Sequence, residues 1–171
     1  AVVASKKSLK WTSDHIIDQF LEQNKLMEKF FPDKREFIEQ NKYGVRGNAI
    51  SWCLTNYMQL KTMDADDWLI VTYENLNLNL YGEMKRIINY IDPSLTFNPK
   101  KIRNVISGSA PSEKARDSLI TRMSRWKKHL TKDEIDDVLE IVHYFGLDII
   151  YDENIMPNMK KLLDPNLKNM I

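Results

Sequence analysis

Apolar residues recur every three or four positions over most of the chain, the spacing that places them on one face of an α-helix. The clearest run is Met84, Ile87, Ile88 and Ile91, which predicts an amphipathic helix. The same pattern predicts further helices over residues 1–10, 13–30, 52–60, 98–106 and 131–145.

Several polar residues stand where they would cap these helices. Ser13 precedes one of the apolar runs and is an expected N-cap. Asp33 with Glu36, and Thr131 with Glu134, match the capping box, in which two side chains accept hydrogen bonds from the free N–H groups of the first turn. We therefore expect helices to begin near these positions.

One stretch departs from the helical pattern. Residues Trp68–Tyr73 are aromatic, β-branched or leucine and show no apolar–polar alternation. This composition predicts a strand buried on both faces, which is typical of a parallel sheet. Because one strand cannot make a sheet, we expect the other strands in an N-terminal half that precedes Ala1.

Composition restricts the classes of function. The chain has 171 residues, 43% of them hydrophobic and 29% charged, as in a globular domain. Its net charge of +1 gives no global field for nucleic acid or an anionic membrane, and no apolar run reaches membrane-spanning length. The single cysteine, Cys53, excludes an internal disulfide framework. The three histidines lack metal-ligand spacing, so we expect no metal site.

A local excess of positive charge marks residues 114–128. Asp117 is the only acidic residue in this segment, and Trp126 follows four of its six lysine and arginine residues. Serines before and within the segment add hydroxyl donors, so the segment is a candidate anion site. A solvated surface loop would have the same charge pattern, but the tryptophan favours a loop anchored on the core. The basic residues are Lys114, Arg116, Arg122, Arg125, Lys127 and Lys128.

The order of three motifs resembles the second half of the PAPS-dependent sulfotransferases. These motifs are Ala-Val-Val-Ala-Ser entering a helix (1–5), Tyr-Glu-Asn-Leu ending a strand (73–76), and Arg-Trp-Lys ending a basic loop (125–127). The family transfers a sulfuryl group from 3′-phosphoadenosine 5′-phosphosulfate (PAPS) to a hydroxyl group. The resemblance implies an α/β fold in which this chain is the C-terminal, mostly helical part of a parallel-sheet domain of P-loop-kinase type.

Under this resemblance, two residues match nucleotide-binding positions of the family. Ser5 matches the serine that binds the 3′-phosphate at the start of a helix, where free N–H groups attract an anion. Tyr73 matches the tyrosine that packs at the adenine, whereas Asn75 replaces the family's usual acid.

The basic loop matches less closely. Ser107 and Arg116 match best in the Golgi tyrosylprotein sulfotransferases, where a serine opens the nucleotide-facing loop and a basic residue contacts phosphate. The Arg-Lys-Gly loop of the cytosolic sulfotransferases is absent, and Arg122 and Arg125 are the candidate substitutes.

The resemblance also implies what this chain lacks. The family's 5′-phosphosulfate loop and catalytic base precede the position of Ser5, so no catalytic residue is assigned here. Partners would be the N-terminal half of the same domain and a sulfate acceptor, which is a carbohydrate, a protein tyrosine or a small-molecule hydroxyl. No nucleic acid is expected. The resemblance fits the cytoplasm and the Golgi lumen equally.

These matches give an expected domain organisation and two alternatives. Residues 1–150 would form the sulfotransferase part, and 151–171 an irregular C-terminal tail. One alternative is a non-enzymatic helical module that binds phosphate or nucleic acid through the basic segment 114–128, although the interleaved aromatic residues typical of base stacking are missing. Another is a different P-loop-type enzyme, such as a kinase.

Overall fold

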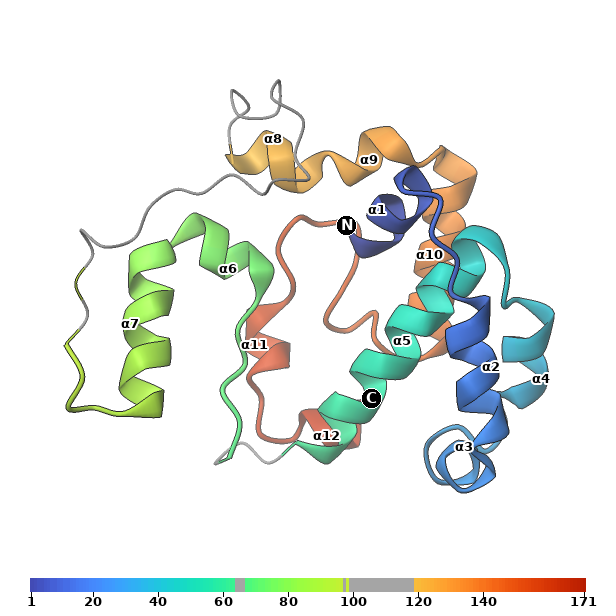
Figure 1. Ribbon diagram of the computed structural model, residues 1–171, viewed down its shortest axis with the longest axis horizontal. Helices are drawn as coiled ribbons and strands as arrows, with labels where there is room; N and C mark the ends of the chain where they lie inside the picture. The colour runs from blue at the N-terminus through green and yellow to red at the C-terminus, as the bar shows by residue number, and fades with distance from the viewer. Residues whose placement is uncertain (64–66, 97, 99–118) are drawn as a thin grey trace. The chain divides into compact units, whose positions relative to one another are not determined.

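The computed structural model describes residues 1–63, 67–96, 98 and 119–171 (Figure 1). The chain divides into two compact units. Unit 1 joins Ala1–Met63 to Arg125–Ile171, and unit 2 is Asp64–Ser124. Each unit is described by itself below.

Unit 1 is built from helices that surround α5. The N-terminal helices are α1 (Val2–Ser8), α2 (Asp14–Glu22), α3 (Asn24–Phe30), α4 (Arg35–Gln40) and α5 (Gly44–Thr62). The C-terminal helices are α9 (Trp126–His129), α10 (Lys132–Tyr144), α11 (Met159–Leu162) and α12 (Leu167–Met170). Helix α5 contacts α1, α2, α10 and α12, so both parts of the chain meet on it (Figure 1).

The core of unit 1 lies around α5. Ile50, Cys53 and Leu54 of this helix are fully buried. Phe31 packs against Tyr57 and Phe145, with ring centroids 5.2 and 5.8 Å apart. Burial of this apolar surface is the main stabilising contribution to such a helical assembly.

Unit 2 contains α6 (Tyr73–Leu78), α7 (Leu80–Ile91) and α8 (Leu119–Ser124), and α6 contacts both of the others. It buries few of its described side chains. No residue of α6 is buried, and Glu83 is the one buried residue of α7. The apolar face of α7 that the sequence predicts therefore remains only partly covered within the described residues.

The expected α/β parallel-sheet fold is wrong. The described residues contain helices and no strand, and Trp68–Tyr73 does not form one. The hydroxyl of Thr72 instead accepts a hydrogen bond from the backbone N–H of Asn75 at 3.2 Å and caps α6, which begins at Tyr73. Apolar composition indicated a strand, but a strand needs a paired neighbour, and none is present in the described ranges.

The capping predictions had mixed outcomes. The capping box of Thr131 and Glu134 is confirmed at the start of α10. Ser13 precedes α2 as expected, but its side chain makes no cap hydrogen bond. The predicted box at Asp33 is wrong, because α4 begins at Arg35 with Lys34 as its N-cap.

Two helical segments also differ from the expected lengths. The helix expected over 13–30 is two helices, α2 and α3, separated at Gln23. The tail expected to be irregular includes α11 and α12, which bury Leu162 and Leu167. Most of the helix expected over 98–106 lies outside the described residues.

Candidate anion-binding surface

Helices α1 and α9 of unit 1 are far apart in the sequence but contact each other (Figure 1). Each carries positive charge. Lys6 and Lys7 lie in the last turn of α1, with Lys10 just after it, and α9 has the sequence Trp-Lys-Lys-His. We call this region the α1–α9 basic surface, defined by Lys6, Lys7, Lys10, Arg125, Lys127 and Lys128.

Lys6 has a structural role. Its ammonium group donates to the hydroxyl of Ser13 at 2.6 Å, and that hydroxyl donates to Oδ1 of buried Asn48 at 2.7 Å. Partial burial lowers the pKa of Lys6 because it disfavours the charged form. This chain of hydrogen bonds connects α1, the start of α2 and α5, and it explains why Ser13 does not cap α2.

Lys7 is also engaged. Its ammonium group lies 2.6 Å from a carboxylate oxygen of Glu134, at the start of α10. This ion pair lowers the pKa of Glu134, and a hydrogen bond from the backbone N–H of Thr131 lowers it further. An anion that binds Lys7 must therefore compete with Glu134.

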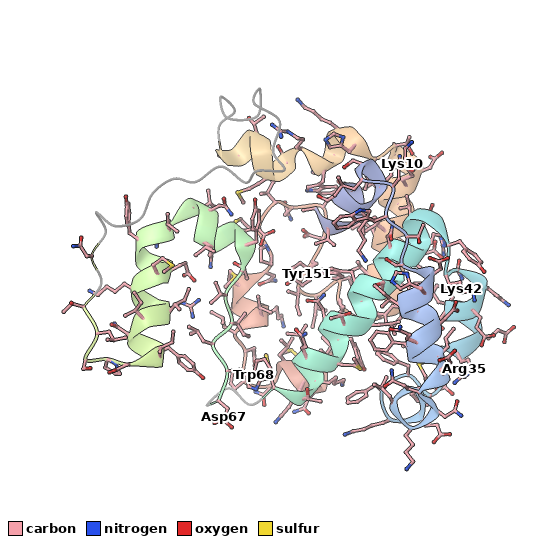
Figure 2. The ribbon with its side chains drawn as sticks, in the orientation of Figure 1. Lys10, Arg35, Lys42, Asp67, Trp68 and Tyr151 are labelled. Atoms are coloured by element: carbon pink, nitrogen blue, oxygen red, sulfur yellow. The ribbon has the colours of Figure 1, made fainter. Side chains whose placement is uncertain are left out.

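Three exposed lysines remain for an anion. Lys10, Lys127 and Lys128 are exposed and make no ion pair with a described residue, although the ammonium group of Lys127 lies over the Trp126 ring. Figure 2 shows Lys10 at the end of α1. The backbone of Lys10 has a φ of 55°, which is uncommon for residues other than glycine, asparagine and aspartate.

Ser5, the expected 3′-phosphate ligand, lies within α1. Its side chain is exposed on a helix that belongs to the α1–α9 basic surface. Its backbone N–H donates to the carbonyl of Ala1 at 3.1 Å, so it is not one of the free N–H groups of a helix start. Anion binding near Ser5 would therefore depend on side chains.

The other expected site residues are divided between the two units and the residues that are not described. Arg125 directly precedes α9, so it belongs to the same surface. Tyr73 is the first residue of α6 in unit 2, with 63% of its surface exposed. Arg122 lies in α8 of unit 2, with its side chain outside the described residues, and Ser107 and Arg116 lie outside them altogether.

Sequence reasoning missed the contact between α1 and α9. Both segments are visibly basic in the sequence, but a charge pattern does not say which segments pack together. Trp11 was also missed. Its indole is exposed directly after Lys10, and its backbone N–H donates to the carbonyl of Lys6 at 2.9 Å. Nothing in the pattern distinguished it from a core tryptophan.

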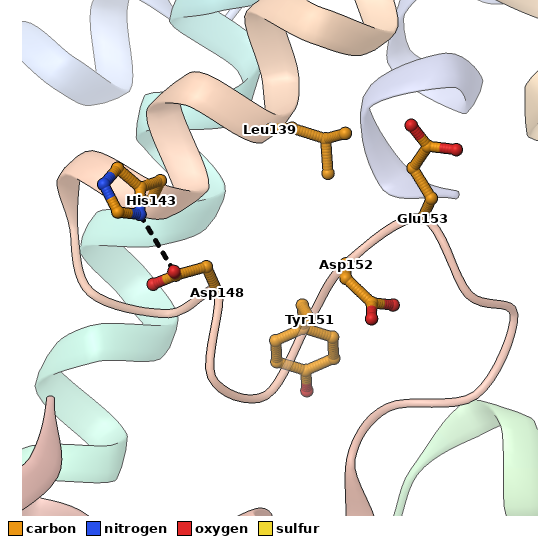
Figure 3. A pocket seen from close by; sticks show the side chains of 6 residues that line it. All are labelled: Leu139, His143, Asp148, Tyr151, Asp152 and Glu153. Carbon is orange, nitrogen blue, oxygen red and sulfur yellow. Dashed lines mark hydrogen bonds and ion pairs between the residues drawn. The ribbon is translucent and has the colours of Figure 1, made fainter.

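A pocket of about 330 Å³ lies on unit 1 between α10 and the following loop (Figure 3). The ring of His143 bonds Asp148 through Nδ1 at 2.8 Å, and its other nitrogen points away from the remaining lining residues. Among the described residues, no group of histidine, cysteine and carboxylate side chains could hold a metal ion. The pocket is lined by Leu139, His143, Asp148, Tyr151, Asp152 and Glu153.

The buried thiol of Cys53 is unsuited to nucleophilic chemistry. Its side chain is fully buried in α5, and burial raises its pKa far above the usual range. In the described ranges, no helix is long and apolar enough to span a bilayer.

Comparison with known proteins gives no relative. No protein-family model matches the chain, and no curated protein or solved structure is detectably similar to it. The resemblance to sulfotransferases therefore rests on the motifs in the sequence alone.

Proposed function

We propose that the chain binds PAPS, with the α1–α9 basic surface taking the 3′-phosphate, and that it serves the transfer of a sulfuryl group to an acceptor hydroxyl. The observation that supports this proposal is the contact between α1 and α9. It joins the helix of Ser5 to α9, which directly follows Arg125, and the resemblance assigns nucleotide binding to Ser5 and makes Arg125 a candidate.

Electrostatics favours a phosphate at this surface. A 3′-phosphate carries nearly two negative charges at neutral pH, and Lys10, Lys127 and Lys128 are exposed cations without ion-pair partners in the described residues. Charge-assisted hydrogen bonds to phosphate are about twice as strong as neutral ones. Exposed contacts of this kind are screened by salt, so we expect binding to weaken as ionic strength rises.

The proposed share of this chain in the reaction is donor binding. Sulfuryl transfer also needs a base that takes the proton of the acceptor hydroxyl and cations that neutralise charge on the leaving phosphate oxygen. No residue of this chain is assigned to those two tasks.

A second candidate function is supported by the helical architecture. All regular elements of the described residues are helices, which suits a non-enzymatic module that binds phosphate or nucleic acid. Trp11 and Trp126 supply aromatic rings next to basic residues, the combination used for single-stranded nucleic acid.

Titration calorimetry at low salt tests both functions. We expect 3′-phosphoadenosine 5′-phosphate to bind at least about tenfold more tightly than adenosine 5′-phosphate, because only the former carries the 3′-phosphate. The Lys127→Gln/Lys128→Gln variant should weaken binding about tenfold, at roughly 0.5–1 kcal/mol for each exposed contact. Lys25→Gln on α3 is the matched control, because Lys25 is exposed and makes no ion pair with a described residue.

Two outcomes bear on the choice between the candidate functions, and a third tests the role of Ser5. Equal affinity for the two nucleotides would contradict the assignment of the 3′-phosphate. Tighter binding of oligothymidylate than of 3′-phosphoadenosine 5′-phosphate would favour the nucleic-acid module. Ser5→Ala should weaken only the nucleotide with the 3′-phosphate, and an equal loss for both would remove Ser5 from the site.

A further inference from the structure

The segment Trp68–Thr72 in unit 2 exposes apolar side chains. Trp68 is 57% exposed and Val71 38%, whereas Thr72 is buried. The segment belongs to no helix, runs as an extended chain into α6 (Figure 1), and Thr72 has the φ and ψ of a strand, −94° and 143°. Figure 2 shows the Trp68 side chain at its start. An exposed run of this composition is typical of a surface that pairs with another chain.

The backbone hydrogen bonds of this segment differ between its two edges. The carbonyl of Ile70 accepts from a guanidinium nitrogen of Arg86 at 2.7 Å, and the carbonyl of Thr72 accepts from the N–H of Leu76 at 3.0 Å. In an extended chain, the N–H and C=O of one residue point to one edge and those of the next residue to the other. Ile70 and Thr72 therefore lie on an edge that the unit's own groups partly occupy.

The opposite edge has no backbone partner in the part of the chain that the structure describes. The N–H and C=O groups of Leu69 and Val71 make no hydrogen bond with any described residue. They form two donors and two acceptors in a row, beside apolar side chains. Such an edge is a template for another strand.

We propose that two copies of this chain pair through this edge as an antiparallel ribbon. Leu69 of one copy would face Val71 of the other and exchange both backbone hydrogen bonds, with the reciprocal pair on the other side of a two-fold axis at Ile70. This ribbon would lie between chains and be antiparallel. It is thus distinct from the parallel sheet that the sequence predicted within the domain.

Charge and size argue for this occupant and for weak binding. No side chain in Trp68–Thr72 is ionisable, so pairing identical segments brings no like charges face to face, and Asp67 would lie opposite Tyr73 of the other copy. Five paired residues bury less than the roughly 1,200 Å² of standard interfaces. We therefore expect a dissociation constant on the order of 10–100 μM.

Two proline variants test the edge assignment. Val71→Pro removes an N–H from the open edge, whereas Ile70→Pro removes one from the edge beside Arg86, and both keep an extended backbone. Sedimentation equilibrium of the whole chain should show a monomer–dimer transition between roughly 10 μM and 1 mM. Val71→Pro should weaken dimerisation at least about tenfold, and Ile70→Pro no more than about threefold. The amide I band should gain an antiparallel-strand component on dimerisation.

Two results would overturn the proposal. One is a protein that stays monomeric up to about 1 mM, beyond the expected range. The other is an equal effect of the two proline variants, which would assign the association to a different surface. Circular dichroism checks that both variants keep the helical content of the parent, and Leu69→Pro repeats the open-edge test at a second position.

Discussion

The ammonium group of Lys7 lies 2.6 Å from a carboxylate oxygen of Glu134. The two residues are 127 positions apart in the chain, and their ion pair joins α1 to α10. Glu134 has a second task, because its carboxylate also accepts the N–H of Thr131 in the capping box of α10. One side chain therefore fixes the start of α10 and neutralises a cation of the α1–α9 basic surface.

Glu134→Gln should separate these two tasks. Glutamine can still accept the N–H of Thr131, but it no longer holds Lys7 by charge. We expect the affinity for 3′-phosphoadenosine 5′-phosphate to rise about two- to fivefold and the free energy of unfolding to change by less than about 1 kcal/mol. Titration calorimetry and urea unfolding measure the two effects. Glu28→Gln on α3 removes an equal charge away from any described ion pair, so an equal gain there would indicate only a long-range effect.

Thr131→Ala should destabilise α10 without changing charge. The hydroxyl of Thr131 accepts the N–H of Glu134 at 3.3 Å, and loss of such a cap costs about 1 kcal/mol. Thr62→Ala is the control, because that hydroxyl donates to carbonyl groups of its own helix and caps no free N–H. Chemical unfolding should show a clear loss for the first variant and little for the second. Equal losses would mean that the cap hydrogen bond is not the cause.

Acid should destabilise the protein through two carboxylates. Lys7 lowers the pKa of Glu134, and Arg46 lowers the pKa of Glu140. In the unfolded chain both return to about 4.3. Their stabilising effect is therefore complete at pH values above this unfolded-state pKa. It is lost as the pH falls through the lower pKa values that the two carboxylates have in the folded protein. The urea concentration at the midpoint of unfolding should therefore decrease as the pH is lowered from about 5 to about 3.

The matched variants define this acid effect. Glu134→Gln/Glu140→Gln should flatten the dependence of the urea midpoint on pH, whereas Glu28→Gln should keep the slope of the parent. An unchanged slope in the double variant would show that other carboxylates dominate acid unfolding.

Gly47→Ala should be strongly destabilising, although alanine is the better helix former. A Cβ at position 47 would lie 2.0 Å from the carbonyl oxygen of Lys42, so the backbone before α5 must move. Overpacking of this kind typically costs about 1–3 kcal/mol. At Gly44 a Cβ would meet nothing within 4 Å, but the φ of 62° costs about 1–2 kcal/mol for alanine. Thermal unfolding of the two variants measures the loss of stability from steric overlap at position 47 and from backbone strain at position 44. A Gly47→Ala protein as stable as the parent would contradict the close packing at Gly47.

Local signals predicted several individual helices correctly, although the predicted fold class was wrong. The capping box of Thr131 and Glu134 was correct because its hydrogen bonds involve residues three positions apart. The amphipathic run through Met84 and Ile91 was correct as a helix for the same reason. Predictions were wrong where a residue's hydrogen-bond partner is distant in the sequence. Ser13 was expected to cap α2, but its hydroxyl bonds Asn48, 35 positions away.

The strand and the site show the same limit. Trp68–Tyr73 has the composition of a strand, but composition cannot supply the neighbour that a strand needs. Ser5 and Arg125 were each named as candidate ligands, and only packing reveals that α1 and α9 lie in contact. The sequence identifies the candidate side chains, but it does not show which helices pack against each other.

The order of synthesis gives the arrangement of unit 1 a consequence inside the cell. The first 63 residues include α5, but α10 and α12 emerge only after all of unit 2. Until then α5 lacks two of the helices that it contacts in the folded protein. Because exposed apolar surface on incomplete chains promotes aggregation, we expect the interval between the synthesis of α5 and that of α10 to be the stage at which unit 1 aggregates most readily.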